Sequence, residues 1–234
     1  MALGPHAIII GGTSGIGLAC AELLASRSYA VTVVGRSQPK LAAALAAVGP
    51  GATGEAADAS DRAALDALFA RLAPVDHLVL AASGDAGAGP FEAVEAEALR
   101  RGFEAKFWVH WNAAQAALPH LAADGSITFV TAASSRLANP GTSGLAAVNG
   151  ALERMARTLA RELAPRRVNA VSPGVIATPW WAGKPAGMFE AESRKAPLGR
   201  AGETREVADA VAFLVGNRFV TGVVLDVDGG LHLT

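Results

Sequence analysis

The chain has 234 residues, of which 51% are apolar and 18% charged, and its formal net charge at pH 7 is −1. This length fits one large α/β domain or two small ones. The balanced charge excludes the basic field that attracts nucleic acid or an anionic membrane surface, so we expect no partner of either kind.

Cysteine content and hydropathy favour a cytoplasmic protein. Cys20 is the only cysteine, which excludes an internal disulfide, and we expect it to pack in the core. No apolar run approaches the roughly 20 residues of a membrane span. The opening stretch M-A-L-G-P-H lacks the basic region of a signal peptide and leads directly into a predicted strand, so no secretion signal is expected.

Short apolar, β-branched runs alternate with alanine-rich helical stretches along the chain. The predicted strands are 6–10, 30–35, 52–57 (the weakest), 77–81, 126–131, 167–171 and 223–227. The predicted helices are 15–28, 39–48, 61–72, 96–122, 145–164 and 203–215. This alternation predicts an α/β fold with a doubly wound parallel sheet and helices on both faces. Because no linker or composition break interrupts it, we expect residues 1–234 to form a single domain.

A glycine-rich loop follows the first predicted strand. Its sequence, G11-G-T-S-G-I-G17, allows backbone N–H groups and the N-terminus of the next helix to face a pyrophosphate. The candidate cofactor-binding residues here are Gly11, Thr13, Ser14, Gly15, Ile16 and Gly17. Since the spacing is not the common G-x-G-x-x-G, an ordinary strand-to-helix turn is the alternative.

The residues after the second predicted strand indicate which dinucleotide binds. NAD-binding domains place an acid about 20 residues after the glycines, where it binds the ribose 2′-hydroxyl. Here Arg36 and Ser37 occupy that region, and they suit the 2′-phosphate of NADP. We therefore expect NADP rather than NAD, although Arg36 could also be an ordinary surface residue beside a helix cap.

The long segment 178–197 is predicted to be a lid. It is rich in Pro, Gly and Trp, and loops of this length usually cover a site. Trp180, Trp181, Met188 and Phe189 would give it an apolar surface toward a substrate, or would pack in a subunit contact instead.

Taken together, these motifs resemble the classical short-chain dehydrogenase/reductase family over nearly the whole chain. Besides the glycine loop, the matching stretches are A-A-D58-A, V168-N-A-V-S-P-G-V-I-A-T178, the segment 197–214 and T221-G-V-V-L-D-V-D-G-G230. The resemblance implies a Rossmann-type fold, NAD(P) binding, a small-molecule substrate and a homo-oligomer, either a dimer or a tetramer. It adds these cofactor contacts: Asp58, Ala59, Ala81, Ala82, Gly84, Asn149, Pro173, Gly174, Ile176 and Thr178.

The four catalytic positions of that family are all changed. The asparagine position carries Lys106, the serine position Ala132, the tyrosine position Leu145 and the lysine position Asn149. In the family the tyrosine protonates the carbonyl oxygen of the substrate. Losing a positioned general acid costs roughly 10²–10⁴ in rate. The only tyrosine here, Tyr29, precedes the second predicted strand and is expected to lie far from the site.

Three functions remain compatible with these changes. In the first, the acid has moved to Lys106, with His110 one helical turn further on, Thr131 orienting the substrate oxygen and Asn149 binding the nicotinamide ribose. Lys106 could instead lie on a solvated helix face or form a salt bridge between subunits, and His110 could belong to an interface with Trp108 and Trp111.

In the second function, the substrate is an iminium ion or a conjugated system that needs no proton donor, and an apolar substrate suits such a site. In the third, the protein binds NADP(H) without turnover, as a sensor or partner subunit. No metal is expected, because the five histidines are scattered without nearby carboxylates or thiols in ligand spacing. The sequence thus favours an NADP(H)-dependent oxidoreductase with an atypical site, and a non-catalytic NADP(H)-binding protein is the alternative.

Overall fold

The computed structural model describes residues 4–234, so the first three residues of the opening stretch lie outside the described chain. One sheet of seven parallel strands forms its centre, in the order β3-β2-β1-β4-β5-β6-β7. The strands are β1 His6–Ile10, β2 Ala30–Gly35, β3 Ala52–Ala56, β4 Val75–Leu80, β5 Leu121–Val130, β6 Arg167–Pro173 and β7 Val224–Val227. The predicted doubly wound α/β fold is confirmed.

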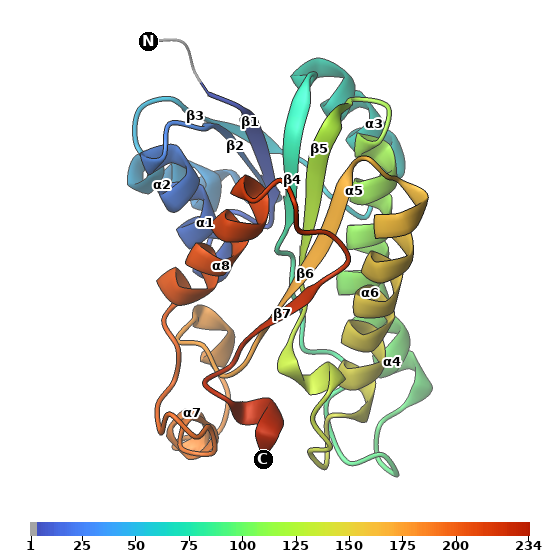
Figure 1. The fold of residues 1–234 in the computed structure, drawn as a ribbon. Helices are drawn as coiled ribbons and strands as arrows, with labels where there is room; N and C mark the ends of the chain where they lie inside the picture. Colours follow the sequence, from blue (N-terminus) through green and yellow to red (C-terminus); the bar gives the residue numbers. More distant parts are fainter. Residues whose placement is uncertain (1–3) are drawn as a thin grey trace.

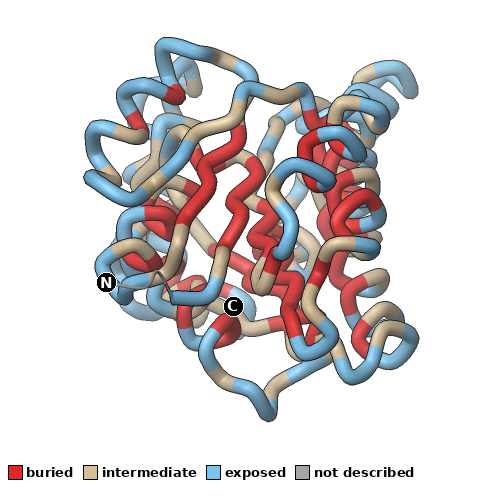
Figure 2. The backbone as a smooth tube through the Cα atoms, turned by 90° about the horizontal axis from the view of Figure 1, so that it is seen from above, coloured by how far each residue is buried: buried red, intermediate tan, exposed pale blue. Residues whose placement is uncertain are grey.

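Helices cover both faces of this sheet (Figure 1). They are α1 Gly15–Ser26, α2 Gln38–Val48, α3 Arg62–Leu72, α4 Ala96–Gly102, α5 Val109–Ala117, α6 Ser143–Glu162, α7 Met188–Ser193 and α8 Thr204–Gly216. Side chains of α1, α2 and α8 form the core on one face, and those of α3, α5 and α6 form the core on the other. Figure 2 shows the consequence: buried strands run through the middle, and the helices expose their outer surfaces.

The order of the strands places a topological switch point at the carboxyl ends of β1 and β4. The chain builds outward from β1 to β3 and then crosses back to β4, so the connections after β1 and β4 leave in opposite directions. Open α/β sheets bind their ligands at such a switch point. The α7 helix and the C-terminus lie at this same end of the sheet (Figure 1).

Two predicted boundaries need correction. The single helix expected over 96–122 is α4, a π-helical segment Phe103–Trp108 and then α5, which ends at Ala117. Pro119 follows two residues later, and proline disfavours helical continuation. Residues 121 and 122 therefore belong to β5, which begins five residues before the predicted start. The other predicted boundaries lie within two residues of the observed ones.

Residues 178–197 are not structureless. They contain a short 3-10 turn, Pro179–Trp181, and α7, so the predicted lid has local structure. None of the helices in the described chain is long and apolar enough to cross a membrane.

Candidate active site

The glycine loop turns so tightly that side chains would not fit at Gly11 and Gly17. Gly11 has φ +81°, and a Cβ there would lie 2.7 Å from the amide nitrogen of Ala82. At Gly17 a Cβ would lie 2.2 Å from the carbonyl oxygen of Gly11. Because these glycines have no side chains, the loop can pack against the end of β4 and leave the backbone N–H groups at the start of α1 uncovered. A pyrophosphate binds to uncovered N–H groups of this kind.

The N-terminus of α1 carries no competing negative group. Ser14 is its N-cap residue in an extended conformation, and in the described chain no side chain caps the helix and no acid lies in its first turn. The first N–H groups of a helix attract anions when they are free of such caps. Thr13 and Ile16 lie half-buried in the same loop. The loop thus fits a dinucleotide phosphate group.

The ends of β2 and β3 bring Arg36 and Asp58 together. Gly35 pairs with Ala56 in the sheet, so the residues that follow these two strands are neighbours. Hydrogen bonds from the backbone and hydroxyl of Ser60 lower the pKa of Asp58, and the positive charge of Arg36 adds a smaller effect. Arg36 is exposed, so its guanidinium is accessible from solvent. Ser37 is the N-cap residue of α2, and Ala59 is buried.

The remaining predicted cofactor contacts also lie at the carboxyl edge. Ala81 donates its N–H to Ile10 at 2.9 Å, which ties the end of β4 to β1. A Cβ at Gly15 would lie 3.5 Å from Cγ2 of Thr178, so the segment after β6 reaches the glycine loop. The predicted residues at this edge are Ala81, Ala82, Gly84, Pro173, Gly174, Ile176 and Thr178. The fold brings the two groups of predicted contacts together at one edge of the sheet.

Lys106 is buried and not solvated, with 6% of its surface exposed. The π-helical segment that carries it, Phe103–Trp108, widens the helix locally, and such segments recur at functional sites. Its Nζ donates to the carbonyl oxygen of Thr131 at 3.1 Å, at the carboxyl end of β5. Burial lowers the pKa of Lys106 from 10.5 to about 8, against an opposing effect of Glu153. The alternative of a solvated helix face is therefore wrong.

His110 lies on the same inner side of this helix, as predicted. It is fully buried, and its Nε2 lies 3.0 Å from the carbonyl oxygen of Ala82. Burial, with a smaller effect from the Lys106 charge, lowers its pKa to about 3, so the ring is neutral at physiological pH. Trp108 and Trp111 are exposed on the opposite side. An interface that includes His110 is therefore excluded in this fold.

Asn149, predicted to contact the nicotinamide ribose, is buried on α6. Its Nδ2 donates to the carbonyl oxygen of Leu145 at 2.9 Å and to the hydroxyl of Ser134 at 3.2 Å. Within residues 4–234 its Oδ1 is buried without a hydrogen-bond partner. A buried acceptor that lacks a donor costs free energy until a ligand supplies one. A ribose hydroxyl fits this atom.

Glu153 is the site residue that the sequence analysis missed. It lies one turn after Asn149 on α6, it is 9% exposed, and its carboxylate accepts from Oγ1 of Thr131 at 2.9 Å. Ser135 donates to the same carboxylate at 2.6 Å, and Arg136 approaches it at 3.5 Å. An available signal was its i+4 spacing from Asn149 on an amphipathic helix.

The segment 178–197, predicted to be a lid, is tied to the turn after β4 by an ion pair. Nζ of Lys184 forms an ion pair with Asp85 and lies 4.4 Å above the ring of Trp180. Trp181 donates its Nε1 hydrogen to the carbonyl oxygen of Ile176 at 2.9 Å and packs against Phe189. The aromatic residues expected in the lid thus hold it together, and Met188 remains exposed.

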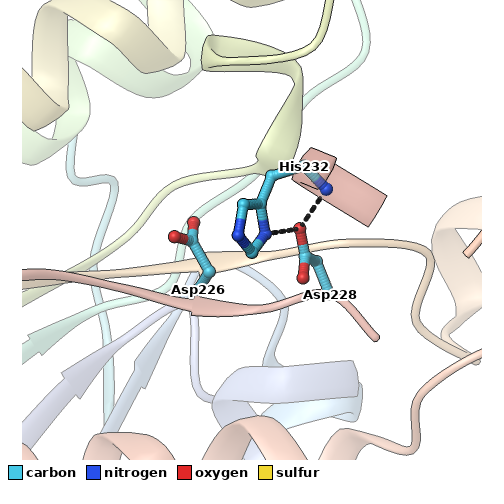
Figure 3. A group of neighbouring side chains, drawn as sticks. All are labelled: Asp226, Asp228 and His232. Carbon is cyan, nitrogen blue, oxygen red and sulfur yellow. Dashed lines mark hydrogen bonds and ion pairs between the residues drawn. The ribbon is translucent and has the colours of Figure 1, made fainter. Parts of the chain in front are cut away.

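One histidine lies beside two carboxylates, which the sequence analysis did not expect. Figure 3 shows His232 between Asp226 and Asp228, which lie two residues apart on β7 and its extension. Asp228 accepts from the backbone N–H of Gly230 at 2.9 Å and from the backbone N–H of His232 at 2.9 Å, and its carboxylate lies 2.8 Å from Nδ1 of His232. Asp226 is paired with Arg136. These contacts explain the cluster as the cap of the last turn.

Comparison with known proteins places the chain in a large group of oxidoreductases. A family model described as enoyl-(acyl carrier protein) reductase matches residues 11–232. The chain is 34% identical to cis-4-hydroxycyclohexanecarboxylate dehydrogenase of Sinomonas cyclohexanicum, over 96% of this chain and 95% of that protein.

Two solved structures share the fold over nearly their full length. One is a small-chain dehydrogenase in complex with NADPH, with 33% identity, a TM-score of 0.84, and coverage of 98% of this chain and 99% of that one. The other is a short-chain dehydrogenase/reductase family protein, with 32% identity, a TM-score of 0.89 and coverage of 99% of both chains.

Proposed function

Because this chain belongs to the short-chain dehydrogenase/reductase family, we propose that it is an NADP(H)-dependent oxidoreductase in which Lys106 is the proton donor. The substrate class is a small, apolar carbonyl, imine or conjugated compound. The observation that carries the proposal is the buried ammonium of Lys106, held against Thr131 at the carboxyl end of β5.

The cofactor assignment depends on the glycine loop, Arg36 and Asn149. The open N-terminus of α1 takes the pyrophosphate, and the Arg36 guanidinium takes the 2′-phosphate, since arginine binds phosphate through a charged fork of donors. Asn149 accepts a hydrogen bond from the nicotinamide ribose at its free Oδ1. When bound, the reduced cofactor supplies a hydride. NADPH in a structural relative supports the choice of NADP.

Lys106 supplies the proton that the family's tyrosine no longer provides. An ammonium has three N–H donors, and among the described residues only the Thr131 carbonyl accepts from it. A free N–H can therefore bind the substrate oxygen and transfer a proton to it as the alkoxide forms. A donor with a pKa near the working pH is well matched to this task. An iminium substrate would take the hydride without any proton.

The rival function is NADP(H) binding without turnover, as a sensor or partner subunit. Leu145 at the tyrosine position favours it, because leucine has no proton to give. Ala132 removes the hydroxyl of the serine position as well. Under this reading the cofactor crevice is retained while the chemistry is lost.

Cofactor binding and turnover distinguish the two functions. Fluorescence titration with NADPH and NADH measures binding, and NADPH consumption is then followed over a panel of ketones, imines and quinones. The proposal expects tight NADPH binding, turnover on at least one compound, and a loss of roughly 10²–10⁴ for ketones in Lys106→Met. Arg205→Met, which removes an exposed positive charge on α8, is the matched control. Binding without turnover on any compound would favour the rival function, and absence of binding would remove both.

A restoration variant tests whether the crevice still accommodates the family's chemistry. Ala132→Ser, Leu145→Tyr and Asn149→Lys together return the hydroxyl, the phenol and the ammonium to their family positions. We expect this variant to gain reduction of simple ketones. No gain would mean that the surroundings of these positions no longer support the reaction.

A homo-oligomer is also proposed. Trp108, at the end of the π-helical segment, and Trp111, in the first turn of α5, expose 42% and 38% of their surface. Clusters of exposed aromatic residues are typical of interfaces. Native mass spectrometry should give a dimer or tetramer, and Trp108→Glu should lower the assembly state. A wild-type monomer would contradict the proposal.

A further inference from the structure

Glu153 places a carboxyl group in the interior, where ionisable side chains are rare. Its carboxylate accepts two hydrogen bonds from hydroxyl groups, from Ser135 at 2.6 Å and from Thr131 at 2.9 Å. A buried carboxylate is stable only when donors and positive charges surround it. These contacts fix the carboxylate at one position and orientation.

Thr131 joins Glu153 to Lys106. Its carbonyl oxygen accepts from Nζ of Lys106 at 3.1 Å, and its hydroxyl donates to Glu153 at 2.9 Å. The same hydroxyl also lies 3.1 Å from the carbonyl oxygen of Val171, so it is held from two sides. Residues from the π-helix, from the end of β5 and from α6 therefore meet at a single threonine.

On its other side Glu153 borders a cavity of about 240 Å³. Arg136, Arg154 and Arg157 line this cavity and are exposed. Arg136 also forms an ion pair with Asp226, which divides its charge between two carboxylates. Glu153 thus separates an arginine-lined, solvent-accessible cavity from the buried ammonium.

Few other charges act on Lys106. Of the helices packed against its segment, α4 directs its charged residues Glu97, Arg100 and Arg101 to solvent, and α5 contributes His110, which is neutral. From α6 comes Glu153, the only acid among the described residues that acts on the pKa of Lys106.

We propose that Glu153 is a positioning residue for Lys106, which fixes Thr131 and supplies the negative charge that keeps the buried ammonium protonated. This inference depends on the proposed function, in which Lys106 gives a proton. Without the carboxylate, desolvation would act alone and would drive the ammonium toward the neutral amine. The lowered pKa of Lys106, about 8 with Glu153 present, agrees with this balance.

The direct test measures the protonation of Lys106 by NMR. The chain has four lysines, so protein labelled with ε-¹³C lysine gives four resolvable signals, and Lys106→Met assigns one of them. In Glu153→Gln the pKa of Lys106 should fall by about one unit or more, the usual effect of losing a close opposite charge. Glutamine keeps an oxygen for the Ser135 and Thr131 hydroxyls, so the fold is expected to survive.

Two further variants separate the effect of charge from the effect of shape. Glu162→Gln removes the same charge from an exposed position of α6, and the pKa of Lys106 should stay unchanged. Glu153→Asp keeps the carboxylate at a shorter reach, so the pKa should lie between those of wild type and Glu153→Gln. This variant remains informative if glutamine impairs folding.

Activity gives the second readout. Reduction of a ketone should decline as pH rises through the pKa of Lys106, and in Glu153→Gln this decline should begin at a pH lower by the same amount as the NMR value. Above that pKa, each further pH unit lowers the protonated fraction of Lys106, and with it kcat/KM, about tenfold.

The outcomes separate the two proposals. An unchanged pKa of Lys106 in Glu153→Gln overturns the role of Glu153, whatever the activity. A lowered pKa in a protein that turns over no substrate supports the role of Glu153 and refutes the proposed proton donation. A lowered pKa with a matching shift of the activity profile supports both.

Discussion

Replacing Lys106 with methionine is expected to stabilise the protein at neutral pH while removing ketone reduction. The structure gives the magnitude. Burial lowers the pKa of Lys106 from 10.5 to about 8, and at 1.36 kcal/mol per pKa unit this difference corresponds to roughly 3 kcal/mol. Methionine removes that cost but leaves Glu153 without its nearby positive charge. A net gain of about 1–2 kcal/mol, or about 3–6 °C in Tm, is expected.

The stability gained by Lys106→Met depends on pH, and the sign of this dependence follows from the lowered pKa of Lys106. The unfolded chain keeps the Lys106 proton up to pH 10.5, whereas the folded chain releases it near pH 8. The cost of the buried ammonium is therefore fully present below pH 8 and disappears as pH rises to 10.5. The advantage of Lys106→Met should be largest at pH 7 and should vanish near pH 10.5.

Thermal unfolding followed by circular dichroism from pH 6.5 to 10.5 tests this. Lys195→Met is the control, because its side chain is exposed and surface changes usually stay within about 0.5 kcal/mol. An equal or lower Tm for Lys106→Met at pH 7 would refute the reasoning. It would mean that the contacts of this lysine contribute to folding more than its buried charge costs.

Three further changes test other parts of the site. Arg36→Ala should weaken NADPH binding about tenfold or more, as measured by fluorescence titration. An equal loss of NADH binding would contradict the assignment of Arg36 to the 2′-phosphate. Gly17→Ala should abolish nucleotide binding and lower Tm, because its Cβ would lie 2.2 Å from the carbonyl oxygen of Gly11. Gly150→Ala is the control: its Cβ would meet nothing within 4 Å, so nucleotide binding should be preserved. Lys184→Ala should speed chymotrypsin cleavage within 178–197 while changing Tm little, and an unchanged cleavage rate would argue against a fastened lid.

The sheet and the glycine loop were predictable because their signals are local. Apolar runs of strand length and alanine-rich helices alternate in the sequence, and a doubly wound sheet is the arrangement that buries both faces of such strands. The prediction was wrong where helix geometry changed within one apolar stretch. No local pattern distinguishes the π-helical segment Phe103–Trp108 from ordinary helix, and the start of β5 at Leu121 depends on its pairing with Val75.

The charged part of the candidate site could not be predicted in the same way. Sequence spacing places Lys106 and His110 on one side of a helix, but whether that side faces solvent or the sheet depends on tertiary packing. Glu153 was missed because an acid on a helix is normally solvated, and its burial follows from where α6 meets the end of β5. The cap formed by Asp228 and His232 likewise depends on how the chain turns after β7.

The place of the glycine loop along the chain has a consequence for how this protein can evolve and be engineered. The glycine loop follows β1, whereas the four altered catalytic positions, Lys106, Ala132, Leu145 and Asn149, all come after β4 in the chain. Asn149 is both one of these positions and the proposed ribose contact, so substitutions there change the reaction and the cofactor site together. Substitutions at Lys106, Ala132 and Leu145 leave the glycine loop, Arg36 and Asp58 unchanged. A library of variants restricted to these three positions therefore varies the reaction while the residues proposed to bind the phosphates and the adenosine stay the same.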